Sequence, residues 1–582
     1  MVYLSYLNVD ETEKFSKSLQ IDKDIIFTDK NLNLISGKSV LWENMISPTK
    51  MEIEFFEKKI YKILRYLISR FELELNAYHN LQKDEIWWKT LLTPWIIEFL
   101  NFYLNREILI NNLLSNKSIS GVITHGDLDE EFIPQDCLEA THVFSSQQYS
   151  WNFVIDKYIF IFKKNIKIST TTNVWEKSPI NKIGNKKYKK IRIYLNYIFR
   201  KINNKNVFMH KLYIPRQAQL KLFIKKFIVN FDFFPPHLEI NTKKMIDQNF
   251  RHRDLQEVSL SEEEFIFRLL IRFIPKSYLE DFKVYFEYQM KYWPKSCKFA
   301  LTANSHLSSD CYKIYMAENR PKTKIFIFQH GSNYGTSEFN LTETFEIDIS
   351  DAFFTWGWKH QNEKVKPLGV IKNIGIKQKK FNKKISLLLV EHVFSYEKEF
   401  VGFNSGNNYE KYKIMAEETV QAIDPDILSK SKIRSLNHFY HSNLSSGKHL
   451  TLPRSVFEGI KGINNFSFFQ NTLLQESAYA KLNVCMTDST PFLEILNIGY
   501  PVVGLWPSNF ESYRESAQKD FHDLKEVGII FNDHRNLAKF INQNFDEIEE
   551  WWQEVSTDLR VLSFREKYAR SITSDIFNFH SQ

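Results

Sequence analysis

Short apolar runs of strand length alternate with helical or loop segments over the second half of the chain, and this rhythm constrains the fold most strongly. The runs are KFALTAN (298–304), KIFIFQHG (324–331), AFFTWGW (352–358), ISLLLVEHVF (385–394), SKIRSL (431–436), NFSFFQ (465–470), LNVCMTDST (482–490), PVVGLW (501–506) and GIIF (528–531). Strands that alternate with helices pair in parallel, with helices over both faces of the sheet. The sequence therefore predicts an α/β protein with two parallel-sheet halves.

The 582 residues are too many for one compact core, so several domains are expected. Apolar residues at helical spacing predict helices at 51–80 and at 87–107, the second starting near Pro94, while Ser261 and Glu264 form a helix-capping pair. Short strands are expected at 2–7, 25–28 and 121–127. The predicted organisation is an N-terminal Rossmann-like domain at 1–375 with helical insertions at about 50–115 and 155–295, a linker at 371–384, a C-terminal Rossmann-like domain at 385–545, and helices at 546–582 that pack back across both.

Composition narrows the class of protein. The net charge of +8, from 77 basic and 69 acidic residues, permits anionic partners without demanding them. Four scattered cysteines indicate a reducing compartment, and no leader or run of about 18 apolar residues is visible, so a cytoplasmic protein is expected. The lysine-rich stretch 185–201 fits either a solvated helix face or a contact with anionic lipid or glycan; no nucleic-acid module is seen.

The run at 324–328 ends in a histidine among turn formers. In doubly wound sheets, ligands bind beyond the carboxyl ends of the strands, which is where His330 is expected to lie. A histidine there can act as a base, and the glycines permit close approach of the backbone to a ligand. The alternative is a histidine that only caps a strand. The other candidate substrate contacts in this stretch are Gln329, Gly331, Asn333, Tyr334 (whose ring can stack on a sugar or base) and Gly335.

Two neighbouring stretches supply further polar candidates. Those following the preceding strand are Asn304, His306, Asp310 and Lys313. Glu346 and Asp348, shortly before the next strand, are alternative bases or ordinary loop carboxylates.

The stretch VCMTDSTPFLEILNIGYPVVGLW (484–506) predicts a strand, a turn, a helix and a second strand. A helix N-terminus with hydroxyl side chains suits a phosphate, so Asp488, Ser489 and Thr490 are candidate donor ligands, although plain helix capping is the alternative. Glu494 can bind a ribose or cap its own helix. Arg434, at the end of another strand, can bind phosphate or form a surface salt bridge, and His438 is a weaker candidate.

Strand-(S/T)-(S/T)-x-x-x-E-helix-G-x-P-strand resembles the donor-side motif of GT-B glycosyltransferases and of CDP-glycerol-type polyol-phosphate transferases. In that order, ELNAYHN…WWKTLLTPWIIEFLNFYLNRE, TANSHLSSDCYKIYMAE, QHGSNYG and ISDAFFTWGW resemble a family of transferases encoded in bacterial O-antigen and other surface-carbohydrate gene clusters. The likeness covers about 60–580. One departure is visible: the family pattern has a His-Glu pair where this chain has Phe345 and Glu346.

The resemblance implies a GT-B-like fold and transfer of a sugar from a nucleotide-activated donor to a surface polysaccharide or its lipid-linked precursor. The expected location is the cytoplasm, either free or at the inner face of the cytoplasmic membrane. A CMP-linked acidic sugar such as Kdo is one donor class. His330, Glu346 and Asp348 are the implied catalytic residues, and no metal or cofactor is expected; the Asp-x-Asp in GDLDEE (126–131) is interpreted as chance. The alternatives are a CDP-glycerol-type polyol-phosphate transferase, a sugar-nucleotide epimerase, and a non-catalytic scaffold of glycan assembly.

Overall fold

The structure is a computed structural model. It describes residues 2–5, 24–27, 50–116, 119–126, 133–146, 167–174, 198–199, 201–203, 205–229, 245–253, 260–378, 383–391, 409–434, 457, 466–467, 471–486, 488–506 and 513–572.

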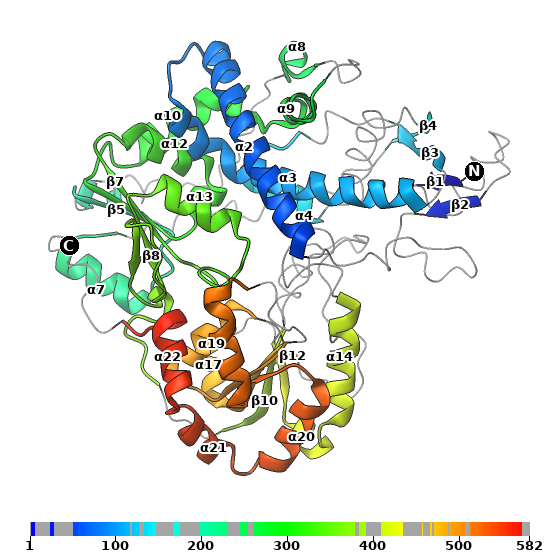
Figure 1. Cartoon of the computed structure of the whole chain (residues 1–582). Helices are drawn as coiled ribbons and strands as arrows, with labels where there is room; N and C mark the ends of the chain where they lie inside the picture. The colour runs from blue at the N-terminus through cyan, green and yellow to red at the C-terminus, as the bar shows by residue number, and fades with distance from the viewer. Residues whose placement is uncertain are drawn as a thin grey trace.

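Three sheets organise these residues, and every strand pairing within them is parallel (Figure 1). The first has the order β2-β1-β3-β4 and consists of β1 (Val2–Ser5), β2 (Asp24–Phe27), β3 (Ile119–Gly126) and β4 (Lys167–Val174). The second has the order β5-β6-β7-β8-β9 and consists of β5 (Val207–His210), β6 (Phe299–Thr302), β7 (Lys324–Phe328), β8 (Ala352–Thr355) and β9 (Val365–Pro367). The third has the order β12-β11-β10-β13-β14-β15 and consists of β10 (Ile385–Val390), β11 (Lys432–Arg434), β12 (Phe466–Ser467), β13 (Ala480–Cys485), β14 (Val502–Leu505) and β15 (Ile530–Phe531).

Helices separate and cover the strands. Those before or around the second sheet are α2 (Lys50–His79), α3 (Glu85–Asn116), α4 (Cys137–Ser146), α7 (Arg216–Lys226), α8 (Gln248–Arg251), α9 (Glu262–Phe273), η5 (Lys276–Tyr278), α10 (Phe282–Tyr292), α11 (Ser305–Ser308), α12 (Asp310–Asn319), α13 (Leu341–Ile349) and η6 (Ile371–Asn373). Those around the third sheet are α14 (Tyr409–Ala422), α15 (Pro425–Ser429), α17 (Leu473–Tyr479), α18 (Thr490–Ile498), α19 (Glu515–Glu526), α20 (His534–Asn544), α21 (Ile548–Val555) and α22 (Leu559–Tyr568). We call residues 205–378, with the helices that cover their sheet, the central unit, and residues 383–572 the C-terminal unit.

The two larger sheets confirm the predicted α/β architecture. The loops after β7 and β13 meet, because the Ser332 backbone N–H donates a hydrogen bond of 2.9 Å to Thr490 Oγ1. Carboxyl ends of strands from two parallel sheets therefore face each other, as expected for a GT-B-like fold.

The four-stranded first sheet is a feature that the sequence did not predict as a unit. Figure 1 shows it beside the C-terminal end of α3, away from the two larger sheets. The segment 155–295, expected to be a helical insertion, contains β4 and β5, and β5 is one of the two edge strands of the second sheet. A four-residue apolar run within a lysine-rich stretch does not distinguish a strand from a helix.

The N-terminal helices follow the predicted apolar spacing. In α2 the side chains of Ile60, Ile63 and Leu67 are 2%, 1% and 0% exposed. The expected helix start near Pro94 is wrong, because α3 begins at Glu85 and Pro94 lies inside it. Ser261 caps α9 as predicted, its hydroxyl accepting a hydrogen bond from the Glu264 backbone N–H at 3.2 Å.

A buried ionic network fixes α12 to the helical layer. Asp310 Oδ1 accepts from Lys313 Nζ at 2.8 Å and from the Tyr278 hydroxyl at 2.7 Å. Its Oδ2 accepts from the Ser277 hydroxyl and from the Cys137 backbone N–H at 3.0 Å. The Asp310 and Lys313 side chains are both 0% exposed, and although burial lowers the pKa of Lys313, Asp310 raises it above its ordinary value.

The end of the described chain returns to the central unit. The Val370 N–H donates to the Arg570 carbonyl and the Arg570 N–H donates to the Trp356 carbonyl, both at 2.9 Å. Asn497 of α18 donates to the Ala569 carbonyl at 2.8 Å, so the same short segment contacts both units.

Candidate functional site

The side chain of Gln329 supports the loop after β7 through hydrogen bonds. Its side-chain oxygen accepts hydrogen bonds from the Trp356 backbone N–H at 2.8 Å and from Trp358 Nε1 at 2.9 Å. Its side-chain amide donates to the Gly331 carbonyl at 2.8 Å, and the residue is 1% exposed. Both ends of the amide are occupied within the protein, so Gln329 supports the loop and does not take the substrate-facing position that the sequence predicted.

His330, Glu346 and His306 form a polar cluster at the carboxyl edge of the second sheet. Glu346 Oε1 lies 2.6 Å from His306 Nε2 and 3.9 Å from His330 Nδ1. The side chains of His306 and Glu346 are 0% exposed, whereas that of His330 is 22% exposed. His330 is thus the member of the cluster that a substrate can reach. Phe345, at the departure from the family pattern, is buried with its ring centroid 6.3 Å from that of His306.

Burial holds the cluster in its uncharged form. It raises the pKa of Glu346 to about 8 and lowers the pKa of His306 to about 3, so the two share one proton across a short hydrogen bond. Burial also lowers the pKa of His330; Glu346 opposes this shift, while His306 and Lys372 add to it. His330 is therefore neutral at pH 7, as a general base must be.

Two buried polar atoms of this cluster lack a hydrogen-bond partner within the described part of the chain, His306 Nδ1 and Glu346 Oε2. Unpaired buried atoms also occur elsewhere in the described residues, and the Tyr334 hydroxyl interacts with the Glu346 carboxyl, so these two atoms are only consistent with a functional site.

The backbone after His330 takes unusual conformations. Asn333 and Gly335 both have φ of +72°, and a Cβ at Gly331 would lie 3.1 Å from Thr490 Oγ1. Tyr334 is 6% exposed, and its ring stacks on that of Phe353 with centroids 5.7 Å apart. The predicted stacking of Tyr334 on a sugar or base does not fit this packing; its hydroxyl instead lies 3.4 Å from His330 Nδ1.

Gly335→Ala should destabilise the protein by about 2–4 kcal/mol, because alanine there is strained by both conformation and contact. A Cβ would lie 2.4 Å from Cδ2 of the buried Trp358 ring, at φ +72°. Gly375→Ala is the matched control, since its φ is +71° and no atom lies within 4 Å of the added Cβ. Thermal unfolding should show a clearly larger loss at 335 than at 375; equal losses would mean that the Trp358 contact relaxes freely.

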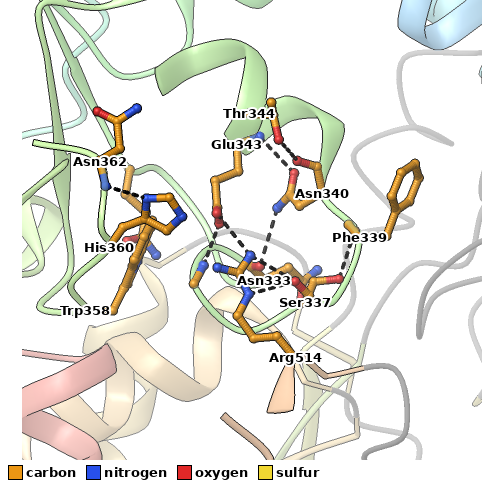
Figure 2. Close-up of polar contacts among 12 residues, drawn as sticks. Asn333, Ser337, Phe339, Asn340, Glu343, Thr344, Trp358, His360, Asn362 and Arg514 are labelled. Atoms are coloured by element: carbon orange, nitrogen blue, oxygen red, sulfur yellow. Dashed lines mark hydrogen bonds and ion pairs between the residues drawn. The ribbon is translucent and has the colours of Figure 1, made fainter. Parts of the chain in front are cut away.

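An arginine from the C-terminal unit holds the same loop (Figure 2). The Arg514 guanidinium donates to the Ser337 carbonyl at 3.1 and 3.0 Å and to Glu343 Oε1 at 3.0 Å. Glu343 Oε2 accepts from the Gly335 N–H at 2.6 Å. Ser337 also pairs with Tyr513 in an antiparallel bridge. The loop that carries His330 is therefore fixed to both units.

The N-terminus of α18 lies opposite the loop after β7. Ser489 is the N-cap residue, and its side chain makes no capping hydrogen bond, while Thr490 accepts from Ser332. Asp488 accepts from the Tyr513 hydroxyl at 2.6 Å, and burial raises the pKa of Asp488 to about 6 against the opposing effect of that bond. The predicted donor turn and the predicted base thus lie on facing loops.

Two of the predicted donor ligands form ion pairs. Glu494 pairs with Lys372 of η6, and Arg434 pairs with Glu476 of α17 while donating to the Asn471 carbonyl at 3.2 Å. Both are largely buried. Their charges are compensated within the protein, which differs from the ribose and phosphate roles that the sequence suggested.

Three further candidates are separated in the structure. Asp348 is 45% exposed and pairs with Lys89 of α3 at 2.7 Å, and Lys313 belongs to the buried network of Asp310. Asn304 precedes α11, and its Oδ1 is buried without a partner in the described residues, so it alone of the three remains a candidate contact.

Sequence reasoning missed Glu343 and Arg514, which are 171 positions apart. The one local signal was helix capping, since the Asn340 side chain accepts from the Glu343 N–H at 2.9 Å. Capping explains the backbone N–H of Glu343 but not its carboxylate.

Some predictions lie outside the described residues, namely those for His438, for 127–131 of GDLDEE and for 185–197. Among the described side chains, no group of three or more His, Cys, Asp or Glu could hold a metal ion. No helix within the described ranges is long and apolar enough to cross a membrane.

Comparisons with known proteins give a family and some partial structural likenesses. The model of a family described as LIC12162 family transferase matches residues 9–576. MurG of Acinetobacter baumannii is 11% identical, with 49% of this chain and 72% of that chain covered, and a TM-score of 0.25. TarM is 11% identical over 47% and 51% of the chains, with a TM-score of 0.26, and the wall teichoic acid polymerase TagF is 12% identical over 49% and 80%, with a TM-score of 0.27. No curated protein matches significantly.

Proposed function

The chain belongs to the LIC12162 family of transferases, and from this premise we propose that it is a glycosyltransferase that uses a nucleotide-activated sugar. One observation carries the proposal. A neutral, partly exposed histidine at the end of β7 stands on a loop that is hydrogen-bonded to the N-terminus of α18. A base beside a helix N-terminus, where negative charge is favoured, suits transfer from a sugar phosphate.

The donor phosphate would bind at the start of α18. The first backbone N–H groups of a helix have no intrahelical partner, and the helix dipole favours negative charge there. Pro491, within the first turn, lacks an N–H, and the Phe492 N–H already donates to the Ser489 carbonyl at 3.0 Å. The Thr490 N–H and the Ser489 hydroxyl would therefore supply the donors. Thr490 would donate its hydroxyl O–H to the phosphate, because its oxygen only accepts in the contact with Ser332.

His330 would activate the acceptor. Its unprotonated ring nitrogen takes the proton of an acceptor hydroxyl as that oxygen bonds to the anomeric carbon. The bond between that carbon and the phosphate oxygen breaks, and its electron pair leaves with the nucleotide at α18. Glu346 lies 3.9 Å from His330 and stabilises the imidazolium that His330 becomes. The positive charge on His330 favours an ionised Glu346, so the proton shared by Glu346 and His306 moves toward His306.

The acceptor and donor are assigned by class only. A bacterial surface polysaccharide or its lipid-linked precursor is the acceptor class that the sequence resemblance supports, with a CMP-linked acidic sugar such as Kdo as the first donor to test. A CDP-glycerol-type donor would occupy the same helix terminus but place phosphorus, not carbon, under attack.

A thermal-shift series with CMP, CDP, UDP, GDP and their sugar conjugates tests the donor site. A nucleotide at about 100 times its Kd should stabilise the chain by about 2.7 kcal/mol. The Ser489→Ala/Thr490→Ala variant should lose that stabilisation, because it removes both hydroxyls at the α18 terminus.

Ser261→Ala is the matched control, since it removes an N-cap hydroxyl from α9 and leaves α18 intact. Stabilisation by CDP-glycerol alone would favour the polyol-phosphate transferase. Absence of a shift with every nucleotide would contradict the donor site and favour a scaffold.

A further inference from the structure

Helix α7 presents three large apolar side chains to solvent on one face. Leu220, Ile224 and Phe227 are 58%, 66% and 59% exposed; Leu220 and Ile224 share a helix face by their spacing of four residues, and Phe227 follows at the C-cap of the helix. The opposite face holds the helix to the second sheet, since Leu222 is 5% exposed within the core that includes β5. Figure 1 shows α7 at the outer edge of the molecule. Single exposed apolar residues are ordinary, but a contiguous stripe indicates an interaction surface.

Cations flank this stripe on both sides. At about 100° per residue, Arg216 lies on one side of the apolar residues, while Lys221 and Lys225 lie on the other. All three are exposed, and the helix sequence RQAQLKLFIKK contains no acidic residue. A partner that complements this face would therefore carry negative charges beside an apolar region.

The charge asymmetry extends well beyond α7. Residues 177–231 contain 15 Lys and Arg and no Asp or Glu. The remaining 62 basic and 69 acidic residues leave the rest of the chain with a net charge of −7, although the whole chain is +8. A basic segment on an otherwise acidic protein is an orienting feature at a charged surface.

We propose that the outer face of α7 docks on an anionic lipid bilayer. Leu220, Ile224 and Phe227 enter the boundary between headgroups and acyl chains, and the flanking cations contact lipid phosphates. Helices with an apolar stripe bordered by Lys and Arg bind membranes in this way, and each cation near an anionic surface strengthens binding by about fivefold. A second copy of the chain is a poorer occupant, because two such basic faces repel each other.

Co-sedimentation of the full chain with vesicles tests this surface. Binding to phosphatidylcholine vesicles with 30% phosphatidylglycerol should exceed binding to pure phosphatidylcholine by at least about tenfold and should weaken with salt. The variant Leu220→Gln/Ile224→Gln/Phe227→Asn should lose at least about tenfold. Asn at 227 tolerates the φ of +52° found there, and Gln preserves helix propensity.

The controls show whether a loss of vesicle binding comes from the α7 side chains themselves, from less exposed apolar surface in general, or from misfolding. Ile414→Gln/Leu559→Gln removes apolar side chains that are 54% and 82% exposed elsewhere, and should bind as the native chain does. All variants should melt at the native temperature, because the substituted groups face solvent. The proposal is overturned by an α7 variant that still binds, by a native chain that stays in solution, or by an α7-dependent dimer in ultracentrifugation without vesicle binding.

Discussion

His330→Ala is expected to lower kcat of the transferase by about 10²–10⁴-fold while leaving nucleotide binding intact, because a positioned base contributes rate of this order. His330 is the exposed member of its cluster, and the donor turn at α18 does not include it. Product formation with the donor identified by thermal shift gives the rate, and the shift itself reports donor binding.

The control and the pH profile sharpen this test. His360→Ala removes a solvent-exposed histidine of the same unit and should leave the rate unchanged. Because burial lowers the pKa of His330 below 6.5, the base stays active at mildly acidic pH, and kcat/KM should fall only as pH drops through that lowered pKa. A rate unaffected by His330→Ala, or an acidic limb centred above 6.5, would remove His330 from the base role.

Asp310→Ala is expected to destabilise the central unit by about 3–5 kcal/mol, because it leaves the ammonium of Lys313 buried without its counter-charge. Both side chains are 0% exposed, and the Asp310 carboxylate is also the acceptor for Ser277 and Tyr278. For a unit of this size, that loss corresponds to a fall in Tm of roughly 6–20 °C.

The double variant Asp310→Ala/Lys313→Met identifies the cause. It replaces the ion pair by apolar groups and should recover a large part of the lost stability, since an unpaired buried charge costs more than a missing pair. Asp558→Ala removes a carboxylate that is 29% exposed and caps α22, and should cost less, as the loss of an N-cap does. If the double variant melted no higher than Asp310→Ala, the loss would come from the hydrogen bonds of Ser277 and Tyr278 instead.

The elements that could be predicted from the sequence are those marked by a local pattern of residues. Ile385–Val390, apolar except for Ser386, becomes a strand buried at every position, and Ser261 caps α9 three residues before Glu264. The four-residue β5 had no such signal, because membership in a sheet depends on a neighbour, here β6, some 90 residues away. The helix start expected near Pro94 was wrong for a related reason, because tertiary packing retains this proline inside α3 against its local preference.

The candidate site shows the same contrast between residues placed by local features and residues whose partners are distant in the sequence. The position of His330 followed from a strand end, and that of Ser489 and Thr490 from a helix start, both of which are local features. The partners of Glu494 and Arg434 did not, since Lys372 and Glu476 lie 122 and 42 positions away. A sequence shows that a charged residue is present, but only the fold shows whether another residue compensates it.

The return of the last described residues to the central unit has a consequence for synthesis. The Val370 N–H and the Trp356 carbonyl find their partners in Arg570, which leaves the ribosome after about 200 more residues, or roughly 10–40 s at ordinary rates of elongation. During that interval the Val370 N–H and the Trp356 carbonyl of the nascent chain lack these partners. Emergence of Arg570, not of the first half, is therefore the earliest point at which these hydrogen bonds can form.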